Sequence, residues 1–109
     1  MNNIISKLNK ALMERKNTNP SESYVAQMHH LGLNKILEKL SEETTEVILA
    51  AKDEKTQSNS DEVIKEIADV WFHTIILLHH LDKSTDLVLE ELEKRYGVSG
   101  LQEKASRKS

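Results

Sequence analysis

The sequence predicts an all-α protein, a chain of four or five helices that forms a dimeric helical bundle. The 109 residues include only three Gly and one Pro. Apolar residues recur at helical spacing, and β-branched residues never alternate cleanly with polar ones as they would in half-buried strands. A chain of this length is expected to form a single domain, residues 1–109.

The first two predicted helices are short. Residues 1–16 carry aliphatic side chains at helical spacing and predict a weak amphipathic helix. The following "NTNPSES", residues 17–23 around Pro20, predicts a break. Residues 23–32 then predict a second helix that ends at Gly32.

Two longer helices follow the break. Asn34 is the expected cap of a helix that runs to about Lys52, and the polar residues 52–60 predict a loop. Ser60 is the expected N-cap of a helix over roughly residues 61–81.

A turn and a last helix complete the chain. Residues 82–84 predict the turn, and Ser84 is expected to cap a helix, "TDLVLEELEKRYG", that stops at Gly97. The remaining "VSGLQEKASRKS" is polar and basic at its end.

The composition excludes several classes of protein. A net charge of −3 gives no indication of a nucleic-acid or membrane partner. The chain has no cysteine, which excludes disulfides and thiolate metal sites and fits a cytoplasmic protein. We also expect no secretory signal and no membrane span, since no apolar run approaches about 20 residues.

Acidic residues gather on one flank of the third predicted helix. With Leu40 at the centre of the apolar stripe, Glu43, Glu46 and Glu42 lie at about −60°, −120° and −160°. Glu43 and Glu46 are therefore neighbours at the i, i+3 spacing.

The fourth predicted helix repeats this pattern. With Ile67 at its centre, Glu66, His73 and Asp69 lie at about −100°, −120° and −160°. Glu66 and Asp69 are again an i, i+3 pair. Two neighbouring antiparallel helices could bring the two acidic flanks together.

Four converging carboxylates require a cation, because they would otherwise repel one another and raise their pKa values. Mg²⁺ prefers oxygen ligands in octahedral geometry, and Mn²⁺ would fit the same set. The alternative is an acidic helix face in solvent, which is common. The second acidic pair, on the matching flank of a mostly buried helix, favours a metal site.

These residues carry a resemblance. "EETTE" (42–46), nineteen residues and then "EIAD" (66–69) resembles the EExxE…ExxD signature of all-α nucleoside-triphosphate pyrophosphohydrolases. More specifically, residues 23–53, 66–78 and 89–108 are similar to the phosphoribosyl-ATP pyrophosphohydrolase family. The similar segments include "GLNKILEK" and "EKASRK", which lie outside the metal motif.

The resemblance implies an enzyme, a homodimer that depends on Mg²⁺. Its substrate would be phosphoribosyl-ATP, which water cleaves to phosphoribosyl-AMP and pyrophosphate, an early step of histidine biosynthesis. Carried over by position, the metal ligands would be Glu43, Glu46, Glu66 and Asp69.

Glu42 is the expected catalytic carboxylate. Cleavage of a phosphoanhydride needs a positioned water and a proton acceptor. Glu42 is free for this role because it belongs to no i, i+3 acidic pair: Thr45 stands three residues after it. The resemblance implies that Glu42 either binds a second metal ion or orients the attacking water.

Basic residues are the expected phosphate contacts. Lys35 and Lys39 share the acidic flank and would meet phosphate oxygens, or else form ordinary helix-surface ion pairs such as Lys39–Glu43. The tail residues Lys104, Arg107 and Lys108 would close over the substrate or remain a solvated terminus; their place in the resemblance favours closure.

The five histidines do not favour zinc, because no HxxxH pair exists and the side chains of adjacent histidines diverge by about 100° on a helix. His73 lies one turn past Asp69 on the acidic flank. It would hydrogen-bond a metal-bound carboxylate, or be a half-buried histidine with ordinary partners.

Apolar residues surround the fourth predicted helix nearly completely, for example Trp71, Phe72 and Ile76. A monomer of this size can hardly bury them all, which predicts a homodimer. Two other functions remain open. They are a nucleotide-pool-cleaning pyrophosphohydrolase with the same chemistry and a helical adaptor without catalysis.

Overall fold

The computed structural model describes residues 3–57 and 60–96. In these residues the chain is all-α, with five helices and no strand, as predicted. The helices are α1 (Ile4–Arg15), α2 (Tyr24–Leu31), α3 (Leu33–Gln57), α4 (Ser60–His80) and α5 (Thr85–Arg95). No helix in this part of the chain combines the length and apolar character that crossing a membrane requires.

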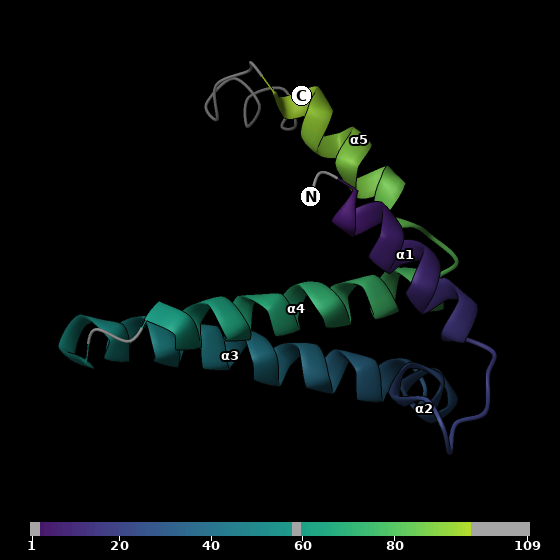
Figure 1. Ribbon diagram of the computed structural model, residues 1–109, viewed down its shortest axis with the longest axis horizontal. Coiled ribbons are helices and arrows are strands. Elements are labelled where there is room, and N and C mark those ends of the chain that lie inside the picture. Colours follow the sequence, from purple (N-terminus) through teal and green to yellow (C-terminus); the bar gives the residue numbers. More distant parts are fainter. Residues whose placement is uncertain (1–2, 58–59, 97–109) are drawn as a thin grey trace.

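The two long helices form an antiparallel hairpin. α3 and α4 lie side by side over most of their length, and α2 crosses the end of the hairpin where α3 begins (Figure 1). α1 and α5 lie against each other and rise from the C-terminal end of α4, so that α5 and α4 enclose an open angle (Figure 1).

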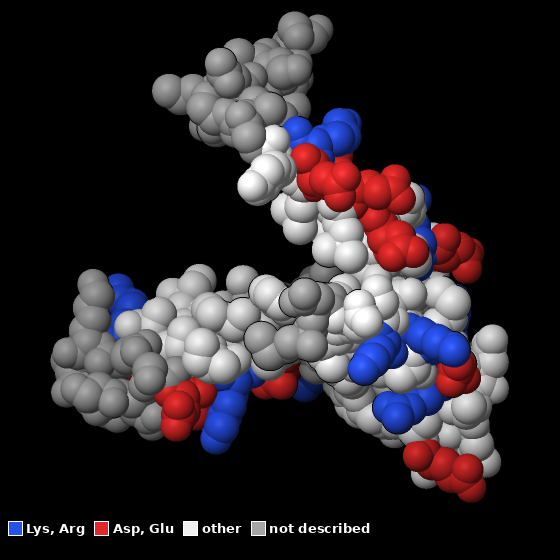
Figure 2. All heavy atoms as spheres, turned by 45° about the horizontal axis from the view of Figure 1, so that its top comes forward, with Lys and Arg blue, Asp and Glu red and all other residues white. Residues whose placement is uncertain are grey.

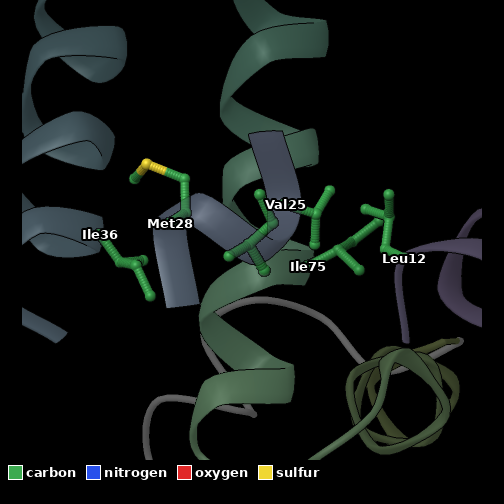
Figure 3. Close-up of a cluster of buried hydrophobic side chains, with 6 residues drawn as sticks. Leu12, Val25, Met28, Ile36 and Ile75 are labelled. Atoms are coloured by element: carbon green, nitrogen blue, oxygen red, sulfur yellow. The ribbon is translucent and has the colours of Figure 1, made fainter. Parts of the chain in front are cut away.

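The buried core lies where α1, α2, α3 and α4 meet (Figure 3). It comprises Leu12, Val25, Met28, Ile36, Ile75 and Ile76, each at most 4% exposed. Burial of side chains of this size stabilises the fold by roughly 1.5–3 kcal/mol each. The core therefore fixes one end of the α3–α4 hairpin and positions α2 across it.

The start of α3 differs from the prediction. Ser23 caps α2 as a β-region residue whose hydroxyl accepts a hydrogen bond from the amide of Ala26 at 3.2 Å. Gly32 has φ +99°, a conformation that turns the chain in one residue, so α3 begins at Leu33. Asn34 is consequently inside the helix, and its predicted role as cap is wrong.

The predicted loop over residues 52–60 is wrong over residues 52–57, because α3 continues to Gln57, and residues 58–59 lie outside the described part of the chain. The segment is polar but contains good helix formers, so its composition is compatible with the observed continuation of the helix. α4 begins at Ser60 and ends at His80, within one residue of the prediction.

The start of α5 uses an unexpected cap. Ser84 stands at the N-cap position, but its side chain makes no capping hydrogen bond. The amide of Thr85 instead donates to Oδ1 of Asn9 on α1, at 3.1 Å. α5 ends at Arg95, and the predicted stop at Gly97 lies outside the described residues.

Candidate metal centre

Three carboxylates converge between the two long helices. Glu43 and Glu46 of α3 and Glu66 of α4 each offer a carboxylate oxygen, and these oxygens lie within 4.8 Å of one another. The antiparallel hairpin produces this arrangement, because it brings the middle of α3 against the middle of α4. The sequence predicted that the two acidic flanks meet, and these three side chains do so.

Glu43 is buried, with 8% of its surface exposed. It shares a face of α3 with Ile36 and Ala50, which are buried seven residues before and after it. Its Oε2 atom is inaccessible to solvent and has no hydrogen-bond partner among the described residues. Burial, then the charge of Asp69, raises the pKa of Glu43 above its usual value.

Glu66 has the most perturbed carboxyl group of the site. A hydrogen bond with Glu46, followed by burial and a hydrogen bond with Glu62, raises the pKa of Glu66 to about 7. Carboxyl groups this close cannot all be ionised without a counter-ion, so they share protons. Oε2 of Glu66, like that of Glu43, is buried without a partner in the described part of the chain.

These properties fit a divalent cation. The donors are all carboxylate oxygens, the ligands that Mg²⁺ and Mn²⁺ prefer. Oε2 of Glu43 and Oε2 of Glu66 are buried and have no hydrogen-bond partner among the described residues, which costs stability unless a positive charge or a proton reaches them. Glu43, Glu46 and Glu66 could hold such an ion.

Asp69 lies near this group but outside it. Its charge acts on the pKa values of Glu43 and Tyr24, which places its carboxylate near the site. Its side chain is exposed, and it does not belong to the set of oxygens within 4.8 Å of one another. Its role as fourth metal ligand stays a prediction.

Two lysines of α3 form local ion pairs. Lys39 lies 3.6 Å from the carboxylate of Glu42, and Lys35 lies 3.4 Å from that of Glu38. Tyr24, followed in effect by the carboxylates of Glu42 and Glu43, raises the pKa of Lys39. Both lysines are partly exposed and remain able to turn toward a ligand. Lys104, Arg107 and Lys108 lie outside the described residues.

His73 is buried beside the carboxylates, with 6% of its surface exposed. Its Nδ1 lies 2.9 Å from the backbone oxygen of Asp69, and its Nε2 lies 2.8 Å from the hydroxyl of Tyr24. Because both ring nitrogens have these partners, His73 does not make the predicted hydrogen bond to a carboxylate in this arrangement.

Tyr24 is the residue of the site that sequence reasoning missed. It comes from α2, and its hydroxyl reaches His73 across 49 residues of sequence. Helical periodicity placed charged residues on the faces of α3 and α4 only. It therefore gave no indication of a contact from α2. The one sequence clue was that Tyr24 falls in the segment 23–53 that carries the family resemblance.

Comparison with known proteins decides the family. Residues 5–96 match the model of a family described as phosphoribosyl-ATP pyrophosphohydrolase. The chain is also 48% identical over 106 residues to the phosphoribosyl-ATP pyrophosphatase of Hydrogenovibrio crunogenus (strain DSM 25203 / XCL-2), a match that covers 97% of this chain and 94% of that protein. The chain belongs to the phosphoribosyl-ATP pyrophosphohydrolase family.

Membership in this family confirms the resemblance predicted from "EETTE" and "EIAD". It also confirms the predicted class of enzyme, a phosphoribosyl-ATP pyrophosphatase of histidine biosynthesis. The matched residues 5–96 include α2, α3 and α4 in full, and with them the three converging carboxylates, His73 and Tyr24. The candidate metal centre thus lies within the residues that match the family.

Proposed function

We propose that this chain hydrolyses phosphoribosyl-ATP to phosphoribosyl-AMP and pyrophosphate at the carboxylate cluster between α3 and α4, with Mg²⁺, and that it acts as a homodimer. The observation that supports the site is the convergence of Glu43, Glu46 and Glu66 within 4.8 Å, with two buried, unpaired carboxylate oxygens. The reaction is that of the family to which the chain belongs. A cytoplasmic location is the prediction that accompanies a biosynthetic nucleotide substrate.

The carboxylates have separate tasks in this proposal. Glu43, Glu46 and Glu66 hold the cation, and Asp69 is the proposed fourth ligand. When bound, the cation supplies positive charge for the phosphate oxygens and lowers the pKa of a nearby water. Mn²⁺ is the proposed substitute, since it takes the same oxygen ligands.

Glu42 is the proposed proton acceptor. The water oxygen forms a bond to the α-phosphorus, the bond between this phosphorus and the bridging oxygen breaks, and pyrophosphate leaves. The carboxylate of Glu42 takes the proton that the water loses. Because Glu42 is exposed on α3, its carboxylate is available to solvent and to a substrate. The carboxylate also lies 3.6 Å from the ammonium group of Lys39.

Lys39 and Lys35 are the proposed phosphate contacts among the described residues. Both ion pairs on α3 involve partly exposed side chains, and such pairs contribute at most about 1 kcal/mol. A polyphosphate with several negative charges can therefore draw the lysines away from Glu42 and Glu38. The tail residues Lys104, Arg107 and Lys108 are proposed to add further charge.

An apolar groove supports the homodimer. Figure 2 shows mostly uncharged side chains on the faces of α4 and α5 that border their open angle. A groove of about 490 Å³ lies there, and Trp71, which lines it, is 59% exposed. Its walls are Ile5, Val70, Trp71, Thr74, Ile75, Leu78, Thr85, Val88, Leu89 and Leu92. An apolar surface of this kind is typical of a protein interface, and a second copy of the chain is the proposed occupant.

The activity is tested with purified protein, Mg²⁺ and a panel of phosphoribosyl-ATP and ordinary dNTPs. We expect release of pyrophosphate from phosphoribosyl-ATP, with dNTPs turned over far more slowly. Equal or faster turnover of dNTPs would indicate a nucleotide-pool-cleaning enzyme instead.

Single variants test the metal ligands. Glu46→Gln and Asp69→Asn should each lower both Mg²⁺ affinity and activity, and Glu93→Gln, an exposed acid on α5, is the matched control. Loss of a partner behind a metal ligand typically costs about 10–100-fold in affinity, and loss of a ligand itself should cost at least as much. A Glu46→Gln protein with unchanged Mg²⁺ binding and hydrolysis would refute the site.

The dimer is tested by light scattering after gel filtration. The wild-type protein should have twice the mass of the 109-residue chain, and Trp71→Glu should shift it toward the monomer, because a buried unpaired charge is costly at an apolar interface. Glu93→Gln again serves as control. A monomeric wild-type protein would contradict the proposal.

A further inference from the structure

The hydrogen bonds of His73 fix the tautomer of its neutral ring. A backbone carbonyl can only accept, so the Nδ1 atom that faces the oxygen of Asp69 at 2.9 Å carries a hydrogen. The neutral ring then has a lone pair at Nε2, and the hydroxyl of Tyr24, at 2.8 Å, donates to it. Both nitrogens of a side chain that is only 6% exposed are therefore satisfied.

This arrangement has a consequence for Glu43. His73 and Glu43 are both buried, and their electrostatic interaction places the two side chains near each other. Because the Asp69 carbonyl and Tyr24 occupy the two ring nitrogens, His73 does not pair with Glu43. Oε2 of Glu43 accordingly remains buried and without a partner.

We propose that Tyr24 is a positioning residue of the metal centre: its hydroxyl holds His73 as a hydrogen-bond acceptor and so keeps the carboxylate of Glu43 free for the cation. The inference rests on the cation site of the proposed function. Without the hydroxyl of Tyr24, Nε2 of the buried ring loses its donor. It then shares a proton with the carboxyl group of Glu43, which competes with the cation for that oxygen.

The contacts of Tyr24 separate the role of its hydroxyl from that of its ring. The ring lies against Phe72 with centroids 6.4 Å apart and meets the edge of His73 at 5.7 Å. A phenylalanine at this position keeps both contacts. The side chain is 44% exposed, so the hydroxyl group contributes little to the buried core. Tyr24→Phe therefore removes the hydrogen bond and little else.

The test measures Mn²⁺ binding to the protein in the absence of substrate, from the electron paramagnetic resonance signal of free Mn²⁺. Tyr24→Phe should raise the Kd for Mn²⁺ by about 10-fold, the lower end of the effect of changes around a metal ligand, because the proton shared with His73 then competes with the cation for Glu43. Tyr96→Phe is the matched control, because Tyr96 is the other tyrosine of the chain, is 89% exposed and follows α5. This control should bind Mn²⁺ as the wild-type protein does.

A second background shows whether the effect passes through His73. His73→Asn removes Nε2 and keeps an amide donor close to the position of Nδ1. In this background Tyr24→Phe should have no further effect on the Kd for Mn²⁺. A 10-fold effect in both backgrounds would refute the proposal, as would a Tyr24→Phe protein with wild-type affinity.

Two further results would refute the positioning role or the cation site. A Tyr24→Phe chain that loses its helical circular dichroism would refute the positioning role, since the hydroxyl would then hold the fold itself. A wild-type protein that binds no Mn²⁺ would refute the cation site, and with it both the proposed function and the inference. Wild-type binding combined with unchanged binding in Tyr24→Phe would refute the inference alone.

Discussion

Acidification from about pH 7.5 to about pH 5 should destabilise the protein by roughly 1 kcal/mol through His29, and His29→Gln should abolish this part of the loss. His29 on α2 and His80 at the end of α4 face each other with their Nδ1 atoms 3.0 Å apart. Their ring centroids are 5.2 Å apart and their planes differ by 16°. Because the nitrogens are closer than two stacked rings could be, the rings meet edge to edge through one shared hydrogen.

The pair accommodates one proton between its Nδ1 atoms but not two. Nε2 of His29 is buried and has no partner in the described part of the chain. An unpartnered acceptor costs less than an unpartnered N–H, so His29 is the Nδ1 donor and His80 the acceptor. Protonation of His29 would create a buried N–H without an acceptor. Burial, followed by the positive charges of His80 and Lys16, accordingly lowers the pKa of His29 to about 4.

The sign of the pH effect follows from this shift. Above the usual pKa of 6.5, His29 is neutral in both the folded and the unfolded chain, and it adds no pH dependence. Between pH 6.5 and about 4 the unfolded chain binds a proton that the folded chain does not, so stability is lost as the pH falls. The shift down to pH 5 corresponds to about 2 kcal/mol, and screening of a half-exposed ring reduces this to about 1 kcal/mol.

The assay is urea denaturation of metal-free protein at both pH values, followed by circular dichroism. The wild-type protein should lose roughly 1 kcal/mol more than His29→Gln between the two conditions. His30→Gln, one residue along α2 at an exposed position, is the control and should behave as wild type. The carboxyl groups with raised pKa values shift stability in the opposite direction, but they are common to all three proteins and cancel.

Equal pH dependence in the wild-type protein and His29→Gln would refute the reasoning, because it would mean that His29 is protonated as readily in the folded chain as in the unfolded one. A greater loss in His29→Gln would refute it as well.

Three other perturbations have defined outcomes. Asn9→Ala should lower the free energy of unfolding by about 1–3 kcal/mol, measured by denaturation, because Oδ1 of Asn9 accepts from both Nε2 of His79, at 2.8 Å, and the first amide of α5 on Thr85. Gly32→Ala should cost about 1–3 kcal/mol from the backbone alone, since φ is +99° and no atom lies within 4 Å of the added Cβ; a thermal melt without a shift would contradict this. Addition of Mg²⁺ at about pH 7 should release roughly half a proton from Glu66, whose pKa is about 7, measured by titration calorimetry in two buffers of different ionisation enthalpy.

The existence of the helices could be predicted because periodicity and turn residues are local signals. The predicted ends of the helices were wrong where the local sequence signal was absent or ambiguous. Asn34 is a good capping residue, yet the left-handed conformation of Gly32 starts α3 before it. The polar composition of residues 52–57 is compatible with both a loop and an exposed helix end, and only the tertiary structure distinguishes them.

The site could be predicted in part, for a related reason. Periodicity assigned Glu43, Glu46 and Glu66 to matching flanks, and the hairpin brings them together. It placed Glu43 beside the apolar stripe, whereas in the described chain Glu43 stands in line with the buried Ile36 and Ala50. Which face of a helix is buried depends on its neighbours, and the sequence of one helix does not contain them.

The contact of Tyr24 with His73 is a second feature that the sequence of a single helix does not predict. It also indicates why the site is built from three helices rather than two. Glu43 is a carboxylate on a core face, and an adjacent buried histidine is the natural partner to neutralise it. On the proposed positioning role of Tyr24, α3 and α4 alone would leave Nε2 of His73 free to form that internal pair. The hydroxyl from α2 satisfies His73 from the other side, at 2.8 Å, and leaves the acid unpaired. On the proposed function, the free protein is thereby less stable than it could be, and a bound cation would restore the difference.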